Sequence, residues 1–202
     1  TVADALHGVD GLIIPGGFGA RGIEGKIQLI RHARENNLPF LGICYGMQLA
    51  VVEYARNVCG MEGAHTEEVE NPEHPIPHKV ICYLPGQKNL TKKGGTMRLG
   101  GHDVEIKKDS RAFKIYGNSV RIRERFRHRY EVNPEYVAQL EAAGLIFSGK
   151  APGTPIMQVV ELPEHPYFMA CQFHPELKSN LLEPAPLFFG LVQAALSRRN
   201  VA

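Results

Sequence analysis

The sequence predicts an α/β fold in which a doubly wound, mostly parallel sheet is flanked by helices. Two short apolar runs are each followed by a helical pattern, and a third apolar run precedes a closing amphipathic segment. This alternation favours a parallel sheet, because parallel neighbours need a crossover connection that a helix supplies. The 202 residues, 44% of them hydrophobic and 22% charged, are expected to form one domain over residues 1–202.

The first strand is predicted at residues 11–15, where Gly-Leu-Ile-Ile-Pro is apolar, too short for a helix and bounded by breakers. A glycine-rich turn at residues 16–19 follows this strand. A helix is expected next, because Ile23, Ile27 and Ile30 recur at helical spacing. Two asparagines and a proline then end the helix.

The second strand is predicted at residues 40–43 and leads directly into a second helix. Residues 60–101 have no lasting periodicity and are expected to form loops and short antiparallel strands. A late strand at residues 170–173 precedes a closing helix that covers the sheet. The apolar stripes of these two helices comprise Met47, Ala50, Val51, Tyr54, Ala55 and Val58 in the first, and Phe188, Leu191, Val192 and Ala195 in the second.

The pentapeptide Gly-Ile-Cys-Tyr-Gly at residues 42–46, the cysteine elbow, has the form of a nucleophile elbow between a strand and a helix. Its glycines leave room where the chain reverses, and the reversal places the Cys44 sulfur at a helix N-terminus, which stabilises a thiolate. A buried and inert cysteine is the alternative for the pentapeptide alone. Cys59, Cys82 and Cys171 lack this context and are expected in the core or at the surface.

The tetrapeptide Phe-His-Pro-Glu at residues 173–176 follows the late strand, so His174 is expected at the same carboxyl edge as Cys44. An imidazole there can take the thiol proton while Glu176 orients the ring. A surface turn is the alternative for the tetrapeptide alone. No histidine pair has zinc-ligand spacing, so no metal is predicted, and solvated positions are expected for His65, His74, His78, His128 and His165.

Attack on an amide also requires N–H groups aimed at the developing oxyanion. The backbone of Tyr45, directly after the nucleophile, is expected to supply one of them. The glycines at residues 16–18 suit the second, since the backbone can approach there without side chains. A tight turn that needs positive dihedral angles is the alternative interpretation of these glycines.

Three segments together resemble a known family. The Pro-Gly-Gly turn, the cysteine elbow followed by Met-Gln, and the late Phe-His-Pro-Glu occur in the order of the class I, or triad, glutamine amidotransferases. Within this family the sequence resembles the glutaminase domains of CTP synthases, at residues 15–22, 41–48, 94–100 and 127–132. The run Gly-Gly-Thr-Met-Arg-Leu-Gly at 94–100 is the most distinctive of these. The resemblance implies the class I glutamine amidotransferase fold.

The resemblance also implies a role for individual residues. Cys44 is the implied nucleophile, His174 the base and Glu176 the group that orients the base. Gly17 and Tyr45 are implied at the oxyanion. The implied contacts with substrate are Gly17, Tyr45, Gly46, Met47, Gln48, Glu68, Arg129 and Tyr130.

Two of these contacts also suit the ends of glutamine chemically. A carboxylate at Glu68 matches the α-ammonium group, and the guanidinium fork of Arg129 matches the α-carboxylate. The sequence departs from the family where Tyr45 replaces the usual leucine and where His-Thr-Glu-Glu at residues 65–68 replaces Asn-Ser-Thr-Glu. The first departure leaves the backbone donor intact and changes the packing of the cysteine elbow.

The implied activity is hydrolysis of glutamine to glutamate and ammonia through a cysteine thioester, with the ammonia aminating UTP to CTP in the full-length enzyme. Another cysteine hydrolase of the same fold, such as a γ-glutamyl hydrolase, is the alternative. The family's first strand and its amidoligase domain are expected to lie outside residues 1–202. The amidoligase domain is the implied partner within a homotetramer.

The implied ligands are divided between the two domains. ATP and Mg belong to the full-length enzyme, GTP is its implied activator, and no cofactor is expected in residues 1–202. Phe18 and Arg21 are the candidates for contacting GTP, through base stacking and a guanidinium contact. A core plug at Phe18 and a solvated charge at Arg21 are the alternatives.

Composition argues against nucleic acid and membranes as partners. The formal net charge of +2 is small, and no apolar run reaches the length of a membrane span or forms a signal peptide. A cytoplasmic location is expected, and the four scattered cysteines suit a reducing compartment. Nucleic-acid binding is the alternative, because alternating arginines would line one face of an extended strand, although Glu124 and Glu131 interrupt them. The arginines are Arg121, Arg123, Arg125, Arg127 and Arg129.

Overall fold

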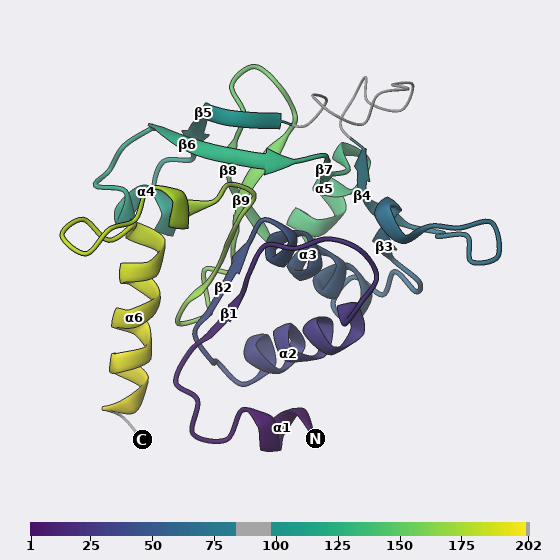
Figure 1. The fold of residues 1–202 in the computed structure, drawn as a ribbon, viewed down its shortest axis with the longest axis horizontal. Helices are drawn as coiled ribbons and strands as arrows, with labels where there is room; N and C mark the ends of the chain where they lie inside the picture. Colours follow the sequence, from purple (N-terminus) through teal and green to yellow (C-terminus); the bar gives the residue numbers. More distant parts are fainter. Residues whose placement is uncertain (84–97, 201–202) are drawn as a thin grey trace.

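A seven-stranded sheet forms the centre of the molecule and carries helices on both faces (Figure 1). The computed structural model describes residues 1–83 and 98–200. In the order in which they lie side by side, the strands are β1 (Leu12–Ile14), β2 (Phe40–Ile43), β10 (Phe168–Cys171), β9 (Met157–Glu161), β8 (Ile146–Lys150), β5 (Arg98–Ile106) and β6 (Arg121–His128). The α/β class and the flanking helices predicted from the sequence are confirmed.

The direction of pairing changes across this sheet. Strand β2 is parallel to both β1 and β10, so the three strands end at the same edge. From β10 onward the described pairs β10–β9, β9–β8, β8–β5 and β5–β6 are all antiparallel. The parallel pairing predicted for most of the sheet is therefore limited to β1, β2 and β10. Antiparallel neighbours need no crossover helix, and β8, β9 and β10 follow one another through short connections.

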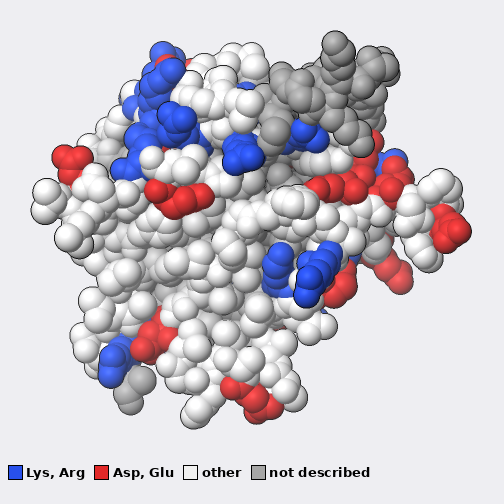
Figure 2. All heavy atoms as spheres, viewed as in Figure 1, with Lys and Arg blue, Asp and Glu red and all other residues white. Residues whose placement is uncertain are grey.

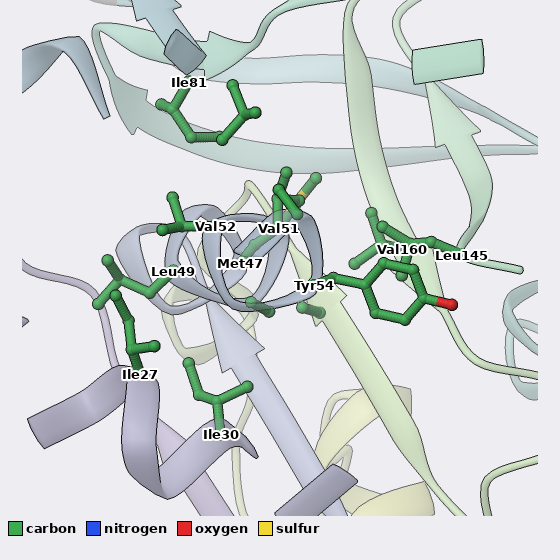
Figure 3. Close-up of a cluster of buried hydrophobic side chains, with 14 of the residues drawn as sticks. Ile27, Ile30, Met47, Leu49, Val51, Val52, Tyr54, Ile81, Leu145 and Val160 are labelled. Carbon is green, nitrogen blue, oxygen red and sulfur yellow. The ribbon is translucent and has the colours of Figure 1, made fainter. Parts of the chain in front are cut away.

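Two helices cover one face of the sheet. They are α2 (Ile23–Glu35) and α3 (Tyr45–Asn57), and the apolar stripe predicted for α2 is buried as expected. Figure 3 shows side chains of both helices packing together, with Ile27 and Ile30 on α2 beside Leu49 on α3. This core forms because apolar residues recur every three or four positions along α2.

The opposite face is covered by α6 (Pro186–Arg199) and the short α4 (Arg111–Ile115). Alternate residues of β2 point to the two faces, so Phe40 joins the core under α2 and α3 while Leu41 joins the core under α6. Helices α1 (Val2–Ala5) and α5 (Pro134–Ala142) complete the described set with the single turns η1 (Glu67–Val69) and η2 (Pro175–Leu177). No helix in the described ranges is long and apolar enough to cross a membrane.

Helix α3 is more deeply buried than its sequence pattern indicates. Every residue from Tyr45 through Ala55 is buried, including the charged Glu53. The pattern predicts one apolar stripe, but α3 lies between the large sheet, α2 and a second small sheet and therefore has no solvent face. Val58, predicted on the stripe, lies beyond the helix as its C-cap and is 39% exposed.

The second sheet accounts for part of the segment without periodicity. It has the order β3 (His65–Thr66), β4 (Lys79–Tyr83) and β7 (Tyr130–Val132). Strands β4 and β7 are antiparallel as expected, whereas β3 and β4 are parallel. Residues 94–97 of the distinctive run at 94–100 lie outside the described residues, and the rest of that run begins β5.

The four arginines of β6 all face solvent, and the residues between them are buried or partly buried. Figure 2 shows Lys and Arg side chains gathered over the part of the molecule where β5 and β6 lie in Figure 1. Two of the arginines pair with acidic residues of β5, Arg121 with Glu105 at 3.4 Å and Arg123 with Asp103 at 3.0 Å. These pairs reduce the net charge of the surface that could attract nucleic acid.

Candidate active site

The cysteine elbow is a strained turn between β2 and α3. Cys44 has φ 52° and ψ −101°, a conformation that side chains rarely adopt, and its N–H donates to the Cys171 carbonyl at 2.7 Å. A Cβ atom on Gly46 would lie 2.1 Å from the Ile14 carbonyl oxygen, and one on Gly42 would lie 2.8 Å from the backbone of Gly46. The elbow therefore requires glycine at both positions, as the pentapeptide predicts.

The segment after β10 brings an imidazole and a carboxylate to the same edge of the sheet. His174 Nδ1 lies 2.5 Å from Glu176 Oε1. The backbone N–H of His174 donates to the Arg125 carbonyl at 2.8 Å. A Cβ atom on Gly16 would lie 3.0 Å from His174 Cε1 and 3.7 Å from Cys44 Cβ. The turn after β1, the cysteine elbow and the turn after β10 thus border one site.

The second nitrogen of this imidazole is available for chemistry. His174 Nε2 is buried and has no hydrogen-bond partner among the described residues. The side chain of His174 is only 15% exposed, whereas that of Glu176 is 45% exposed. A buried nitrogen without a partner is uncommon in proteins and marks a position that a proton donor or ligand can complete.

The surroundings of the Cys44 thiol favour its protonated form. Burial raises the pKa of Cys44 to about 12, and the carboxylates of Glu176 and Glu131 act in the same direction. The Tyr45 N–H and the Gln172 side chain donate to the sulfur and lower the pKa, but burial outweighs both. Burial thus opposes the thiolate that the helix N-terminus is expected to stabilise, so a base has to take the thiol proton for Cys44 to react.

Gln172 is a site residue that the sequence analysis missed. Its Nε2 lies 3.6 Å from Cys44 Sγ, and its Oε1 accepts a hydrogen bond from Gln48 Nε2 at 3.2 Å. Gln48 Nε2 also donates to the Tyr130 carbonyl at 3.0 Å. A glutamine inside an apolar strand pattern was the available signal, because a buried amide requires hydrogen-bond partners. The sequence could not indicate which partners those are.

The glycine-rich loop (residues 15–22) lies over the elbow and is held by few contacts. Tyr45 Oη donates to the Gly19 carbonyl at 2.7 Å, and the Gly19 N–H donates to Glu68 Oε1 at 3.0 Å. A Cβ atom on Gly17 would lie 3.5 Å from the Tyr45 ring. The structure thus places Gly17 beside the Tyr45 side chain, and the Tyr45 hydroxyl group ties the loop to α3.

The residues implied for the amino-acid end of glutamine also lie in one neighbourhood. Glu68 is in η1, and burial raises the pKa of its carboxyl group while the Gly19 N–H and the Arg129 charge lower it. Burial and then the Glu68 charge raise the pKa of Tyr45. The Tyr130 ring packs 4.4 Å from that of Tyr83. Gly46, Met47 and Gln48 are buried in the first turn of α3.

The two candidate effector residues lie on the outer surface of the glycine-rich loop. Phe18 is 85% exposed, so the alternative that it plugs the core is wrong. Arg21 is exposed and has no hydrogen bond or ion pair within the described ranges. Gly19 and Gly22 have positive φ angles of 75° and 73°, but Gly16 and Gly17 do not, so the alternative that those two glycines form a turn needing such angles is wrong.

Two histidines expected in solvent are buried instead. His128 Nε2 lies 2.6 Å from Glu131 Oε1, with both side chains 2% exposed. His165 Nε2 lies 3.0 Å from the Ala33 carbonyl, which accepts its hydrogen bond. Both positions arise from long-range packing. In the part of the chain that the structure describes, no three His, Cys, Asp or Glu side chains converge as metal ligands.

Comparisons with known proteins agree on one family. A model of the class-I glutamine amidotransferases matches residues 1–194. The CTP synthase of Pyrococcus furiosus is 59% identical over 191 residues, which are 94% of this chain and 35% of that protein. The chain therefore spans about a third of the length of this curated relative.

Solved structures show the same similarity. The glutaminase domain of CTPS from Trypanosoma brucei, solved with bound acivicin, is 41% identical with a TM-score of 0.88, over 96% of this chain and 74% of that chain. A putative GMP synthase protein from Thermoplasma acidophilum shares the fold, with a TM-score of 0.61 and 18% identity over 98% of this chain and 79% of that chain. The chain belongs to the class I glutamine amidotransferases and, within them, to the glutaminase domains of CTP synthases.

Proposed function

We propose that this chain hydrolyses glutamine to glutamate and ammonia through a thioester on Cys44, and that the ammonia aminates UTP to CTP in the full-length enzyme. The observation that carries the proposal is the meeting of Cys44 with the His174–Glu176 pair at the carboxyl ends of β2 and β10. A thiol, an imidazole and a carboxylate in this order provide a nucleophile, a base and the group that orients the base.

The His174–Glu176 contact determines how the imidazole acts. Glu176 accepts the Nδ1–H hydrogen bond, so Nε2 keeps a lone pair and takes the Sγ proton as sulfur bonds to the amide carbon. His174 then gives this proton to the departing nitrogen, which leaves as ammonia. A water molecule deprotonated by His174 attacks the resulting thioester, glutamate leaves, and the proton returns to Cys44.

The oxyanion of each tetrahedral intermediate is stabilised by backbone N–H groups of Tyr45 and Gly17. The Tyr45 N–H already donates toward the Cys44 sulfur, at the start of α3. Gly17 lies over the Tyr45 ring on the glycine-rich loop. The Tyr45 donor is fixed by the buried start of α3, whereas the Gly17 donor is held by the few contacts of the glycine-rich loop. A donor that is positioned before the reaction gives strong electrostatic stabilisation, so the position of this loop should affect the rate.

The substrate's amino-acid end is bound between Arg129 and Glu68. Arg129 holds the α-carboxylate and Glu68 the α-ammonium group, and the influence of Arg129 on the Glu68 pKa supports their proximity. Gly17, Tyr45, Gly46, Met47, Gln48 and Tyr130 complete the contacts in this proposal.

The full-length protein adds an amidoligase domain that binds UTP, ATP and Mg, in a cytoplasmic homotetramer. GTP activates the glutaminase reaction by contacting Phe18 and Arg21. The exposed aromatic ring and the exposed guanidinium group fit a nucleotide base and its phosphates. Because Gly17 precedes Phe18 directly, a ligand on that ring can steady the oxyanion donor.

Labelling with acivicin, the compound bound in the Trypanosoma brucei domain, tests the nucleophile. Peptide mapping by mass spectrometry is expected to find the modification on Cys44 only. Cys59 and Cys82 are more exposed than Cys44 and serve as internal controls for plain accessibility. Labelling of either one in place of Cys44 would contradict the proposal, and faster hydrolysis of γ-glutamyl peptides than of glutamine would favour a γ-glutamyl hydrolase.

Arg129→Ala tests the carboxylate contact. It is expected to raise KM for glutamine and to leave hydrolysis of a small thioester without an α-carboxylate unchanged. Arg127→Ala is the matched control, because Arg127 lies two residues upstream on β6 with its side chain in solvent. Equal losses on both substrates would show that Arg129 acts only in the structure.

A further inference from the structure

A chain of side-chain hydrogen bonds joins Cys44 to Tyr130, the first residue of β7, which directly follows Arg129. The Tyr130 carbonyl accepts from Gln48 Nε2 at 3.0 Å, and the same Nε2 donates to Gln172 Oε1 at 3.2 Å. Gln172 Nε2 then donates to Cys44 Sγ at 3.6 Å. Gln48 is 3% exposed and Gln172 is fully buried, so water does not compete for these bonds.

The direction of this chain follows from its first acceptor. A backbone carbonyl only accepts, so the Gln48 amide must present its nitrogen to Tyr130. The second hydrogen of that nitrogen is directed at Gln172, whose amide oxygen must therefore accept it. The Gln172 amide therefore turns its NH₂ group toward the Cys44 sulfur. A flipped Gln172 amide would place its NH₂ group against the NH₂ group of Gln48 and its oxygen against the sulfur.

Resting on the proposed role of Cys44 as nucleophile, we propose that Gln172 is a further catalytic residue. Its amide donates to the Cys44 sulfur and stabilises the thiolate as the proton leaves for His174. Gln48 is a positioning residue that holds the Gln172 amide in the donating orientation.

The surroundings of the sulfur show why such a donor matters. Burial and the carboxylates of Glu176 and Glu131 all oppose a negative charge on Cys44, and the neighbouring Cys171 thiol is itself fully buried. Only the Tyr45 N–H and the Gln172 amide donate to the sulfur among the described residues, while His174 Nε2 makes no hydrogen bond with them in this state. A hydrogen bond to an anion is stronger than one to a neutral thiol, so the Gln172 donor stabilises the thiolate selectively.

The test measures how fast iodoacetamide alkylates Cys44 at several pH values, in the 202-residue chain, with peptide mapping as the readout. Gln172→Met removes the donor at similar size. It is expected to slow Cys44 alkylation about tenfold at any pH below the midpoint of the rate–pH curve. This slowing equals a shift of that midpoint by about one pH unit. Gln172→Glu is expected to slow it further, because a carboxylate then faces the sulfur although the shape hardly changes.

Two controls separate this effect from damage to the fold. Gln158→Met removes another fully buried amide, which donates to Glu131 at 3.4 Å and not to the sulfur, and is expected to leave the Cys44 rate within about twofold. The alkylation rate of Cys59 in each variant is the internal reference. Gln48→Met is expected to lower the Cys44 rate several-fold, and adding Gln172→Met to it should lower the rate no further than Gln172→Met alone.

An unchanged Cys44 rate in Gln172→Met, or a loss of the same size in Gln158→Met, would overturn the role of Gln172. Should Gln172→Met unfold, the near-isosteric Gln172→Glu decides by the same comparison. Iodoacetamide carries no glutamine group, so these outcomes do not depend on substrate binding. A wild-type chain that reacts with iodoacetamide but not with acivicin would overturn the proposed function instead.

Discussion

The cysteine elbow and the glycine-rich loop border the same site but are held in different ways. All residues from 40 to 50, which include the elbow, are buried, and backbone atoms of β1 contact the elbow glycines directly. Seven of the eight residues in the glycine-rich loop are exposed and the eighth, Gly19, is partly exposed. Gly19 carries the loop's two hydrogen bonds to the Tyr45 and Glu68 side chains. The position of Cys44, the proposed nucleophile, therefore depends on close packing, and that of Gly17, the proposed second oxyanion donor, depends on a few polar contacts.

This difference indicates where the activity of the domain can be adjusted. Packed backbone has one arrangement, because any other would overlap atoms. A loop held by two hydrogen bonds can shift at a small free-energy cost, since each bond contributes only about 0.5–1.5 kcal/mol net. We therefore expect substitutions around the elbow to change stability most, and substitutions in the glycine-rich loop to change catalysis and its control.

The largest effect is expected from Gly46→Ala. The new Cβ would lie 2.1 Å from the Ile14 carbonyl oxygen, and backbone on both sides prevents relaxation. We expect a loss of at least about 4 kcal/mol in the free energy of unfolding, measured by urea denaturation, or no folded protein at all. Gly25→Ala in α2 is the control: its Cβ meets nothing within 4 Å and should add about 0.5–1 kcal/mol of stability.

A slightly smaller effect is expected where a buried ion pair supports α3. Arg34 Nη2 lies 2.8 Å from Glu53 Oε1, and the Glu53 side chain is fully buried. Arg34→Met leaves that carboxylate unpaired and is expected to destabilise the fold by about 3–5 kcal/mol in denaturation. Arg31→Met removes the exposed pair with Glu35 and should change stability by less than about 1 kcal/mol. Similar losses for both variants would contradict the burial of this pair.

Tyr45→Phe sharpens the comparison by loosening the glycine-rich loop alone. It deletes the hydrogen bond to the Gly19 carbonyl and is expected to reduce stability by about 0.5–1.5 kcal/mol. Glutamine hydrolysis should fall several-fold, because Gly17 moves from the oxyanion position, while iodoacetamide alkylation of Cys44 should not change.

The control for this prediction is Tyr54→Phe. Tyr54 lies on the same helix and its hydroxyl donates to the Ala143 carbonyl at 2.6 Å, outside the site. The stability losses of the two variants should be similar, with glutamine hydrolysis retained in Tyr54→Phe. Equal hydrolysis by both variants would show that the loop contact has no catalytic effect.

The smallest effect on stability is expected from Phe18→Ala, because an 85% exposed ring contributes little packing. The free energy of unfolding should change by less than about 0.5 kcal/mol. In the full-length enzyme the same variant is expected to lose its activation by GTP, measured as the ratio of glutamine hydrolysis with and without GTP. Leu181→Ala, at a 97% exposed position outside the site, is the control, and an unaltered GTP response in Phe18→Ala would remove Phe18 from the effector site.

Much of the fold was predictable because its signals are local. The isoleucine spacing of α2, the apolar runs of β1 and β2 and the glycine pair of the cysteine elbow each depend on neighbouring residues. The antiparallel half of the sheet was not predictable in the same way. Its strands β5 and β6 are rich in polar residues, and their pairing is decided by contacts between residues distant in sequence.

The site divides in the same manner. The sequence by itself determined the candidate nucleophile, the candidate base and its carboxylate. The cysteine elbow is encoded by five consecutive residues, and the His174–Glu176 contact joins residues only two positions apart. Only the tertiary structure decided that Gln172 faces the sulfur, that Glu68 accepts from Gly19, and that His128 is buried. Those contacts join residues brought together by packing, and the burial that raises the pKa of Cys44 to about 12 exists only once the sheet and its helices have assembled.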